Sequence, residues 1–191
     1  METYFAQHLQ ILTESAFSKH EIAEIQNAFK VVHLKKNDFL VRQGEICKYF
    51  CFVQSGILQH AVCIDEEEKT TYLALKNSFT SSLKSFLSKT PSRKSIKAVF
   101  DCELLVLDFT TFDELYKNHE AFKLFYHKLI ERQIFLIDDY RIDLLTLSPE
   151  ERYQKLLTNE PKLLQQVPLH YLSSFLGISS RHMSRIRRQI K

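Results

Sequence analysis

The 191-residue sequence lacks the features that would place a protein in a membrane or outside the cell. No apolar run approaches the roughly 20 residues needed to span a bilayer. Residues 1–10 do not show the basic-then-apolar pattern of a secretory signal peptide. The four cysteines, Cys47, Cys51, Cys63 and Cys102, occur in apolar, strand-like stretches without an export signal before them. We therefore expect a cytoplasmic protein whose cysteines are reduced core residues.

Glycine is also scarce, with three in the whole chain. Neither a glycine-rich phosphate-binding loop nor the Gly-x-Ser-x-Gly turn of serine hydrolases occurs, and no His-x-His pair typical of metal-binding β-barrel enzymes is found. Cys47 and Cys51, if both lay in one strand, would be about 13 Å apart, whereas a zinc ion lies about 2.3 Å from each sulfur. We therefore expect neither an enzyme nor a metal site.

Hydrophobic patterning divides the first part of the chain into a helical segment and a β-domain. Residues 1–29 have apolar residues at helical spacing, namely Leu9, Leu12, Ile22, Ile25 and Phe29. From Val31 to Leu107, short apolar runs and alternations such as Leu58, His60, Val62 and Ile64 indicate antiparallel strands. Turns are expected at Asn37-Asp38, Gln43-Gly44-Glu45 and Ser55-Gly56. Thr111 and Glu114 predict a capping box for a short helix through Tyr116.

A long helix is predicted over residues 119–147. Phe122, Leu129 and Leu136 recur at intervals of seven residues, and so do Ile130, Ile137 and Leu144. Two adjacent seams favour a helix that packs on its own domain along one seam and meets a second copy along the other. The alternative is that both seams are buried within a monomer. The residues expected in the dimer interface are Phe122, Leu129, Leu136, Ile130 and Ile137. Ser148, Pro149 and Glu151 then predict the start of another helix at a domain junction.

Residues 169–188 predict a helix-turn-helix. Leu172, Phe175 and Leu176 form one apolar stripe, Gly177 permits a tight turn, Ile178 fills the corner, and Ser179 is a good N-cap. The second helix would bury Met183, Ile186 and Ile190. It would expose Ser180, Arg181, His182, Ser184, Arg185 and Arg188, which suit a helix placed in the major groove of DNA. The alternative is a surface helical hairpin with a basic face.

Positive charge is concentrated in the same segment. No Asp or Glu follows Glu160, and the last 31 residues carry a charge of +6. Because the whole chain carries +3, residues 1–160 carry −3. A basic segment confined to the predicted groove reader is what phosphate neutralisation requires. A membrane-surface helix is the less favoured alternative, because this helix has a modest apolar face and no aromatic anchors.

Taken together, these motifs resemble the family of the cyclic-AMP receptor protein and the fumarate and nitrate reduction regulator, the Crp/Fnr family. The resemblance rests on the runs 39–45 and 52–56, the long helix and the helix-turn-helix, in this order. It implies an α+β fold with three parts: a cyclic-nucleotide-binding-like antiparallel β-roll over 1–118, a dimerisation helix over 119–147, and a DNA-binding domain over 148–191.

The resemblance also implies a bacterial homodimeric transcription regulator that binds a pseudo-palindromic site in double-stranded DNA, with RNA polymerase as a further partner. By the family's pattern, Ser180, Arg181 and Arg185 would read bases. Ser179, His182 and Arg188 would hold phosphates. A two-stranded wing usually follows the recognition helix, and since the sequence ends at Lys191 we expect a wing that is short or absent, or a truncated chain.

The sequence departs from the family where an effector would bind. Nucleotide-binding members carry a Gly-Glu and an Arg-Ser pair, but the corresponding stretch here resembles Ser81-Ser82, with no glycine between Gly56 and Gly177. The candidate effector pocket is therefore assigned to Ser81, Ser82, Arg93 and Lys94. We expect cyclic AMP not to be the effector. Because residues 1–46 contain no cysteine, an iron-sulfur cluster like that of the redox-sensing branch is not expected either.

The function that these observations favour is sequence-specific DNA binding by a homodimer whose β-roll has an unidentified effector or none. The competing hypothesis is a ligand-binding or protein-interaction β-roll whose C-terminal helices serve assembly only.

Overall fold

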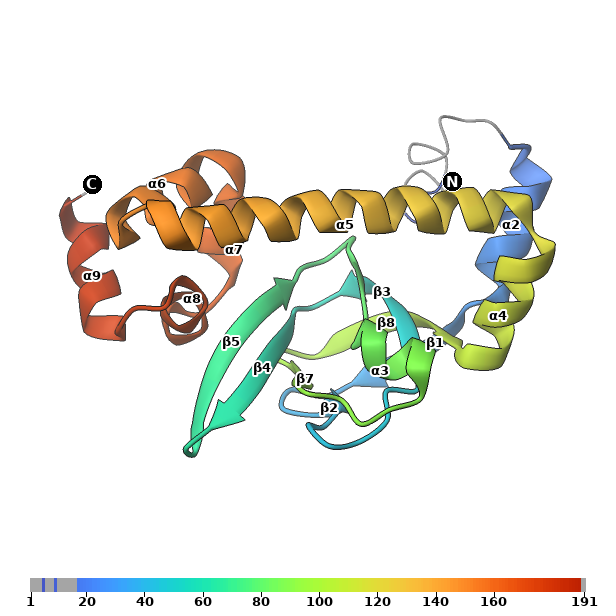
Figure 1. Ribbon diagram of the computed structural model, residues 1–191, viewed down its shortest axis with the longest axis horizontal. Helices are drawn as coiled ribbons and strands as arrows, with labels where there is room; N and C mark the ends of the chain where they lie inside the picture. The colour runs from blue at the N-terminus through green and yellow to red at the C-terminus, as the bar shows by residue number, and fades with distance from the viewer. Residues whose placement is uncertain (1–4, 6–8, 10–16, 190–191) are drawn as a thin grey trace.

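The computed structural model describes residues 5, 9 and 17–189. Eight strands lie between residues 30 and 108: β1 (Lys30–Leu34), β2 (Phe39–Val41), β3 (Tyr49–Ser55), β4 (Leu58–Ile64), β5 (Glu67–Ala74), β6 (Phe79–Thr80), β7 (Ser95–Ala98) and β8 (Cys102–Asp108). The helices are α2 (Lys19–Ala28), α3 (Leu83–Ser88), α4 (Phe109–Asn118), α5 (Glu120–Thr146), α6 (Pro149–Asn159), α7 (Pro161–Gln166), α8 (Leu169–Leu176) and α9 (Ser180–Gln189). Helix α5 runs along the β-domain, and α6 to α9 gather at its far end (Figure 1).

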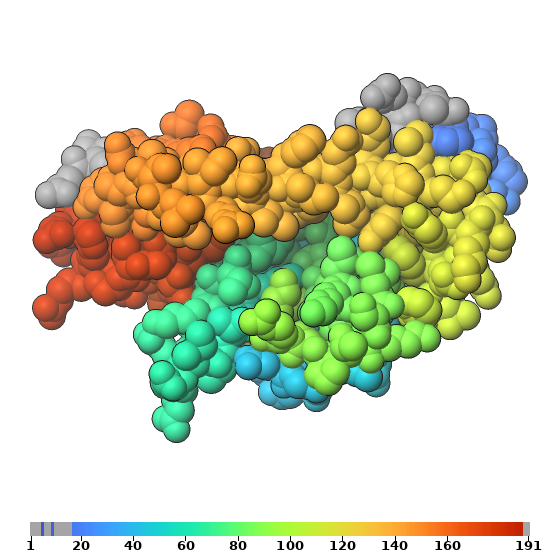
Figure 2. Space-filling model, viewed as in Figure 1, coloured from blue at the N-terminus to red at the C-terminus, as the bar shows by residue number. Residues whose placement is uncertain are grey.

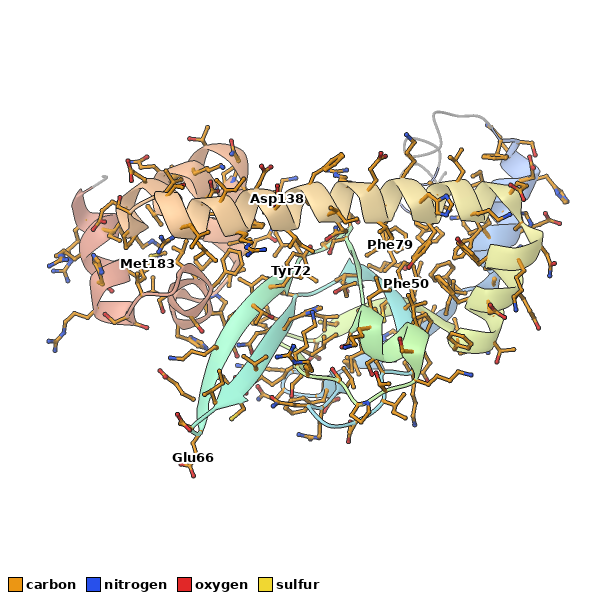
Figure 3. All side chains as sticks on the ribbon, viewed as in Figure 1. Phe50, Glu66, Tyr72, Phe79, Asp138 and Met183 are labelled. Carbon is orange, nitrogen blue, oxygen red and sulfur yellow. The ribbon has the colours of Figure 1, made fainter. Side chains whose placement is uncertain are left out.

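The strands form an antiparallel β-roll of two four-stranded sheets, as predicted. One sheet has the order β1-β8-β3-β6 and the other the order β2-β7-β4-β5, and all the strand pairs are antiparallel. The strand β5 is at an edge of its sheet, and the β4–β5 hairpin projects from the roll with Glu66 at its tip (Figure 3). The predicted fold class is therefore confirmed for the β-domain.

Several turns of the roll adopt left-handed backbone conformations without glycine. The expected turns at Asn37, Gly44 and Gly56 all have positive φ angles, of 72°, 90° and 87°. A Cβ atom at Gly56 would lie 2.5 Å from Cys102 Sγ and 2.6 Å from the Asp101 carbonyl oxygen, so only glycine fits there. Further left-handed positions, which the sequence analysis missed, are Asp65, Glu66, Asn77 and Lys89.

Aromatic side chains fill the space between the roll and the first half of α5. Phe79 of β6 lies 4.9 Å from Phe125 of α5 and 5.5 Å from Phe50 of β3, measured between ring centroids. Phe112 of α4 lies 5.3 Å from Phe122. The labelled side chains of Phe50 and Phe79 point toward α5 in Figure 3. Rings in tilted and edge-on contact add to the stabilisation from burial alone, so α5 is part of the roll's own core.

Helix capping follows the sequence at the start of α6 and departs from it at the start of α4. Ser148 and Glu151 form the predicted capping box at the start of α6, with Pro149 at the first position. The box predicted for Thr111 and Glu114 is wrong. Helix α4 begins earlier, and its N-cap Asp108 accepts a 3.0 Å hydrogen bond from the Thr111 backbone N–H. An Asp that ends a strand and caps the next helix leaves no loop between the two.

The N-terminal helical segment is described in part. Ile22 and Ile25 of α2 are buried, as predicted, and Phe29 is the C-cap residue of that helix. Leu9 is fully buried. Leu12 lies outside the described residues. The structure thus supports the predicted apolar face at the residues it describes.

The outer face of the second sheet is covered as well. Ile57, Leu73 and Val99 of the roll share one apolar cluster with residues of α6 to α9. Gln59 and His60, neighbours on β4, are both buried, because the core covers one face of the strand and the C-terminal helices the other. The alternation of apolar and polar residues in β4 therefore does not indicate that one face of the strand is exposed. Its far end is exposed, and Cys63 there is an exposed free thiol rather than the expected core residue.

Within residues 17–189 no helix is both long and apolar enough to cross a membrane.

Candidate nucleic-acid interface

Helices α8 and α9, with Gly177 in the turn between them, lie where the sequence predicts the two helices of a helix-turn-helix. Gly177 ends α8 with a φ angle of 69°, and its backbone N–H donates to the Ser174 carbonyl. The Ser179 side chain accepts a 3.2 Å hydrogen bond from the His182 backbone N–H, as an N-cap does. Leu172, Leu176, Met183 and Ile186 are buried in the angle between the helices, and Ile178 packs against them. Ile190 lies outside the described residues.

The face of α9 opposite this core is basic. Arg181, Arg185 and Arg188 are exposed and are spaced so that they share one side of the helix. Met183, labelled in Figure 3, points the other way, into the C-terminal helices. In the space-filling view α9 lies at one end of the molecule with its surface open (Figure 2). Three guanidinium groups on one exposed helical face can donate to phosphates and to guanine edges.

Two of the predicted contact residues already have partners within the chain. His182 is half-buried, and its Nε2 lies 2.9 Å from Oε1 of Glu150 in the first turn of α6. The hydrogen bond to His182 lowers the pKa of Glu150, and Arg185 contributes a smaller electrostatic effect. Ser180 is exposed, and its Oγ lies 3.0 Å from that of Ser173 in α8. The sequence analysis missed Glu150, because the carboxylate is brought to α9 only by the packing of α6.

Arginines also fix the arrangement of the C-terminal helices. Arg152 donates to the Leu147 carbonyl at 2.7 Å and to the Leu176 carbonyl at 2.9 Å, joining the ends of α5 and α8. Arg187 donates to the Leu164 carbonyl at 3.5 Å. Carbonyls at helix C-termini lack partners in their own helix, and cations near them are favoured. Part of the basic charge counted in the sequence is therefore structural.

The two seams of α5 have different surroundings. Phe122 is fully buried and Leu129 is 5% exposed, both in the subunit's own core, so assigning them to a dimer interface is wrong. Leu136 is half-buried. The other seam is open, with Ile130 half-buried and Ile137 64% exposed. The prediction that one seam packs on the β-domain is confirmed, and it is the first seam that does so.

Beside Ile137, the open seam has further apolar neighbours. Ile134 is 57% exposed, Leu144 56% and Leu145 78%. The positions 130, 134, 137, 141 and 144 alternate in spacing between four and three residues, as in a coiled-coil core, and all of them except Arg141 are apolar. Phe135 and Ile142 are also exposed, on another side of the helix. This surface is available to a second molecule.

The predicted effector residues lie around the start of α3 and in the loop before β7, and a hydrogen bond joins these two segments. The Ser82 and Ser92 hydroxyl oxygens are 2.7 Å apart and buried. Ser81 donates to the Tyr49 carbonyl at 2.9 Å. Arg93 is exposed, whereas Lys94 is half-buried, and burial lowers the pKa of its ammonium group. The serine hydroxyls are thus hydrogen-bonded to protein groups. Of the two cationic side chains, Lys94 is half-buried and Arg93 is exposed.

A buried polar group near Lys94 went unnoticed in the sequence. His60 of β4 is 2% exposed, and its Nε2 lies 2.7 Å from the Thr80 hydroxyl. Its Nδ1 has no protein partner. Its ring stands edge-on to that of Tyr72, with centroids 5.3 Å apart, and Tyr72 lies below α5 in Figure 3. Burial, and less strongly the charge of Lys94, hold the pKa of His60 well below its ordinary value.

No metal centre is present among the residues that the structure describes, where no three His, Cys, Asp or Glu side chains are grouped suitably. Cys47 precedes β3 instead of lying in it, so the strand spacing assumed for Cys47 and Cys51 does not apply. Cys47 Sγ instead hydrogen-bonds the Tyr49 carbonyl at 3.4 Å.

Comparisons with known proteins agree with this architecture. The family model of the cyclic nucleotide-binding domain matches residues 31–119. No curated protein sequence matches the chain at a significant level. The catabolite activator protein of Thermus thermophilus is 21% identical, with a TM-score of 0.59, and the match covers 94% of this chain and 86% of that one. FixK2 of Bradyrhizobium japonicum is 12% identical, with a TM-score of 0.73, over 85% of this chain and 84% of that one.

A third structure, from Eubacterium rectale and described as that of a transcriptional regulator of the Crp/Fnr family, is 16% identical with a TM-score of 0.67, over 92% of this chain and 84% of that one. In all three cases the similarity extends over the roll, the long helix and the C-terminal helices. The chain therefore shares the fold of these regulators: residues 31–119, which match the cyclic nucleotide-binding domain, are followed by a long helix and further C-terminal helices.

Proposed function

We propose that this protein is a homodimeric, sequence-specific DNA-binding transcription regulator. The observation that carries the proposal is the basic face of α9, where Arg181, Arg185 and Arg188 are exposed while Met183 and Ile186 anchor the opposite side. A helix fixed by its apolar side and lined with arginines on the other can enter a major groove and bind both bases and phosphates. RNA polymerase remains a predicted partner of such a regulator.

The open seam of α5 supports the homodimer. Its exposed residues, among them Ile134, Ile137 and Leu144, form a coiled-coil pattern that has no partner within the subunit. A twofold dimer along this seam would present two recognition helices about 34 Å apart, one turn of DNA.

We further propose that the β-roll does not respond to cyclic AMP. The hydroxyls of Ser81 and Ser82 are already engaged with protein groups, and Arg93 is exposed. A ligand present at 100 times its dissociation constant adds about 2.7 kcal/mol to stability, which gives a measurable rise in melting temperature. We expect no rise with cyclic AMP. Saturable stabilisation that is lost in Arg93→Ala would contradict this proposal.

The DNA-binding proposal is tested by selecting binding sites from a randomised duplex library and measuring affinities by fluorescence anisotropy. Arg185→Ala should cost about 1 to 3 kcal/mol per half-site and relax the preference at one base position, since only a base contact carries sequence information. Arg188→Ala should weaken binding to all sequences nearly equally and reduce the salt dependence by about one counterion per subunit.

Arg181 tests the same assignment in another way. The family often has an acidic residue at this position, and a donor in its place should favour guanine over cytosine at the contacted base. If alanine at all three arginines lowered affinity without changing base preference, α9 would be an electrostatic patch and not a reader of sequence. That result would favour C-terminal helices that serve assembly.

A further inference from the structure

A carboxylate lies beside the basic face of the recognition helix. No acidic residue follows Glu160 in the sequence, yet the packing of α6 against α9 places Glu150 Oε1 2.9 Å from His182 Nε2. Both side chains are accessible, with 45% of Glu150 and 28% of His182 exposed. Because His182 lies one residue after Arg181 on the first turn of α9, this hydrogen-bonded pair borders the surface that would meet DNA.

Glu150 is not needed to cap its own helix. The first turn of α6 is closed by Ser148 and Glu151, whose carboxylate accepts 2.8 Å hydrogen bonds from the Ser148 backbone N–H and hydroxyl. The Ser148 hydroxyl in turn accepts from the Glu151 backbone N–H. The Glu150 carboxylate is thereby left to bind across to α9. A purely structural role would consist of its favourable charge near a helix N-terminus and a hydrogen bond with its own backbone N–H, and the charge effect is small at an exposed site.

The position of Glu150 has a consequence for phosphate binding. A helix N-terminus beside a recognition helix would normally attract the DNA backbone, because its first N–H groups are unpaired. Here the same place carries a carboxylate that repels phosphates and holds one nitrogen of His182. A phosphate that binds His182 at Nε2 must displace Glu150, because the single N–H at that nitrogen cannot donate fully to the phosphate and the carboxylate at once.

We infer that Glu150 is a positioning residue that competes with DNA phosphates for His182 and so lowers the sequence-independent part of DNA affinity. This inference rests on the proposed DNA-binding function. Its charge and its hydrogen bond act in the same direction: the charge opposes the phosphates, and the bond keeps His182 on the side of α6. The hydrogen bond of Glu150 is to His182, and its electrostatic interaction with Arg185 is the weaker of the two.

The test compares full-length wild type with Glu150→Gln on a non-target duplex at several salt concentrations. We expect Glu150→Gln to bind about threefold or more tightly, with a salt dependence steeper by up to about one counterion per subunit. Glu150→Asp, which keeps the charge, should bind as wild type does. Glu114→Gln is the matched control, because it removes the same charge from an exposed site on α4 and should change affinity less than about twofold.

A double-mutant cycle with His182→Ala decides whether the effect passes through the imidazole. The gain from Glu150→Gln should be smaller in the His182→Ala background, because a neutral amide oxygen competes for the imidazole less strongly than a carboxylate does, and the imidazole is then absent. Full additivity would overturn the competition, as would unchanged or weaker binding by a folded Glu150→Gln protein. If wild type bound no DNA at all, this inference and the proposed function would both fall. Specific binding by wild type with no response to Glu150→Gln would overturn this inference alone.

Discussion

The two halves of α5 differ in their surroundings although they belong to one uninterrupted helix. In the first half, Phe122 and Phe125 are fully buried among the aromatic rings of the roll. In the second half, Ile134, Ile137 and Leu145 expose more than half of their surface. Apolar residues are about equally frequent in the two halves, so composition does not distinguish them. The first half belongs to the core of the roll, whereas the second half leaves apolar side chains exposed.

The contrast shows what a repeat of apolar residues can and cannot predict. Seven-residue spacing identifies the sides of a helix, and it indicated two seams correctly. It does not say which seam meets the subunit's own core, because that depends on where the sheets lie. A carboxylate substituted into each half provides the most direct comparison of the two.

The largest expected effect is in the first half. Leu129→Asp would bury a carboxylate without a partner in the core of the roll, at a cost of several kcal/mol, comparable with the total stability of many domains. We expect the variant to lose its cooperative unfolding transition, monitored by circular dichroism. Ile137→Asp, the same substitution in the second half, should retain that transition. Cooperative unfolding of Leu129→Asp near the wild-type temperature would contradict the buried seam.

The second prediction concerns self-association. Ile134→Asp combined with Ile137→Asp should convert the dimer to a monomer at micromolar concentration, because each carboxylate would be buried in the seam between two copies. Sedimentation velocity measures the change directly. Thr146→Asp is a suitable control, since it adds a carboxylate to an exposed site of the same helix away from the seam. A wild-type protein that is monomeric without DNA would rule out the seam as an interface.

The third prediction compares a buried histidine with an exposed one in their effect on the pH dependence of stability. His60 is buried and neutral, and its pKa in the folded state lies well below the ordinary value because of burial. In the unfolded chain the imidazole takes up a proton below a pH of about 6.5, so stability should fall as pH drops from about 6.5 toward 5.

The measurement is the free energy of unfolding in urea at pH 7.5 and pH 5. His60→Gln should flatten the pH dependence in this window, whereas His127→Gln, at an exposed position on α5, should leave it in place. The lowered pKa values of Asp101 and Asp108 affect stability only at lower pH, below the ordinary range of aspartate. A pH dependence unchanged in His60→Gln would mean that other groups cause it.

How much the sequence could predict depended on how local each signal was. The helix-turn-helix was predictable residue by residue, because its stripe, its Gly177 turn and its Ser179 cap all act within a few positions of each other. The box at Thr111 failed because a stronger cap, Asp108, lies three residues earlier at the end of a strand. The burial of both Gln59 and His60 could not be inferred, since it depends on the packing of α8 beside the neighbouring strand β5, and α8 lies more than 100 positions from β4 in the chain.

The candidate site shows the same limit. The exposed arginines of α9 followed from helical periodicity, but the partner of His182 did not, because Glu150 reaches it only through tertiary packing. A carboxylate in the first turn of a helix ordinarily indicates stabilisation of that helix's N-terminus. In this protein the capping box at Ser148 and Glu151 was recognisable in the sequence, and it left Glu150 without an assigned role.

The smallest predicted effect concerns the contact between the C-terminal helices and the roll. The Ser174 side chain of α8 accepts a 2.9 Å hydrogen bond from the Thr70 backbone N–H and donates at 3.2 Å to the Glu68 carbonyl, both on β5. As β5 is at the edge of its sheet, these backbone groups lack a neighbouring strand. The same serine thus links the C-terminal helices to the β-roll.

Ser174→Ala should destabilise this contact by about 1 to 2 kcal/mol, because it removes two hydrogen bonds of modest net value. Hydrogen exchange should show faster exchange of the Thr70 amide, with little change in the melting temperature of the roll core, whose burial is unaffected. Ser184→Ala is the control, since Ser184 donates only to the Ser180 carbonyl within α9. If the Thr70 amide stayed as protected in Ser174→Ala as in wild type, the apolar cluster shared by Ile57, Leu73 and the C-terminal helices would be sufficient to hold the two parts together.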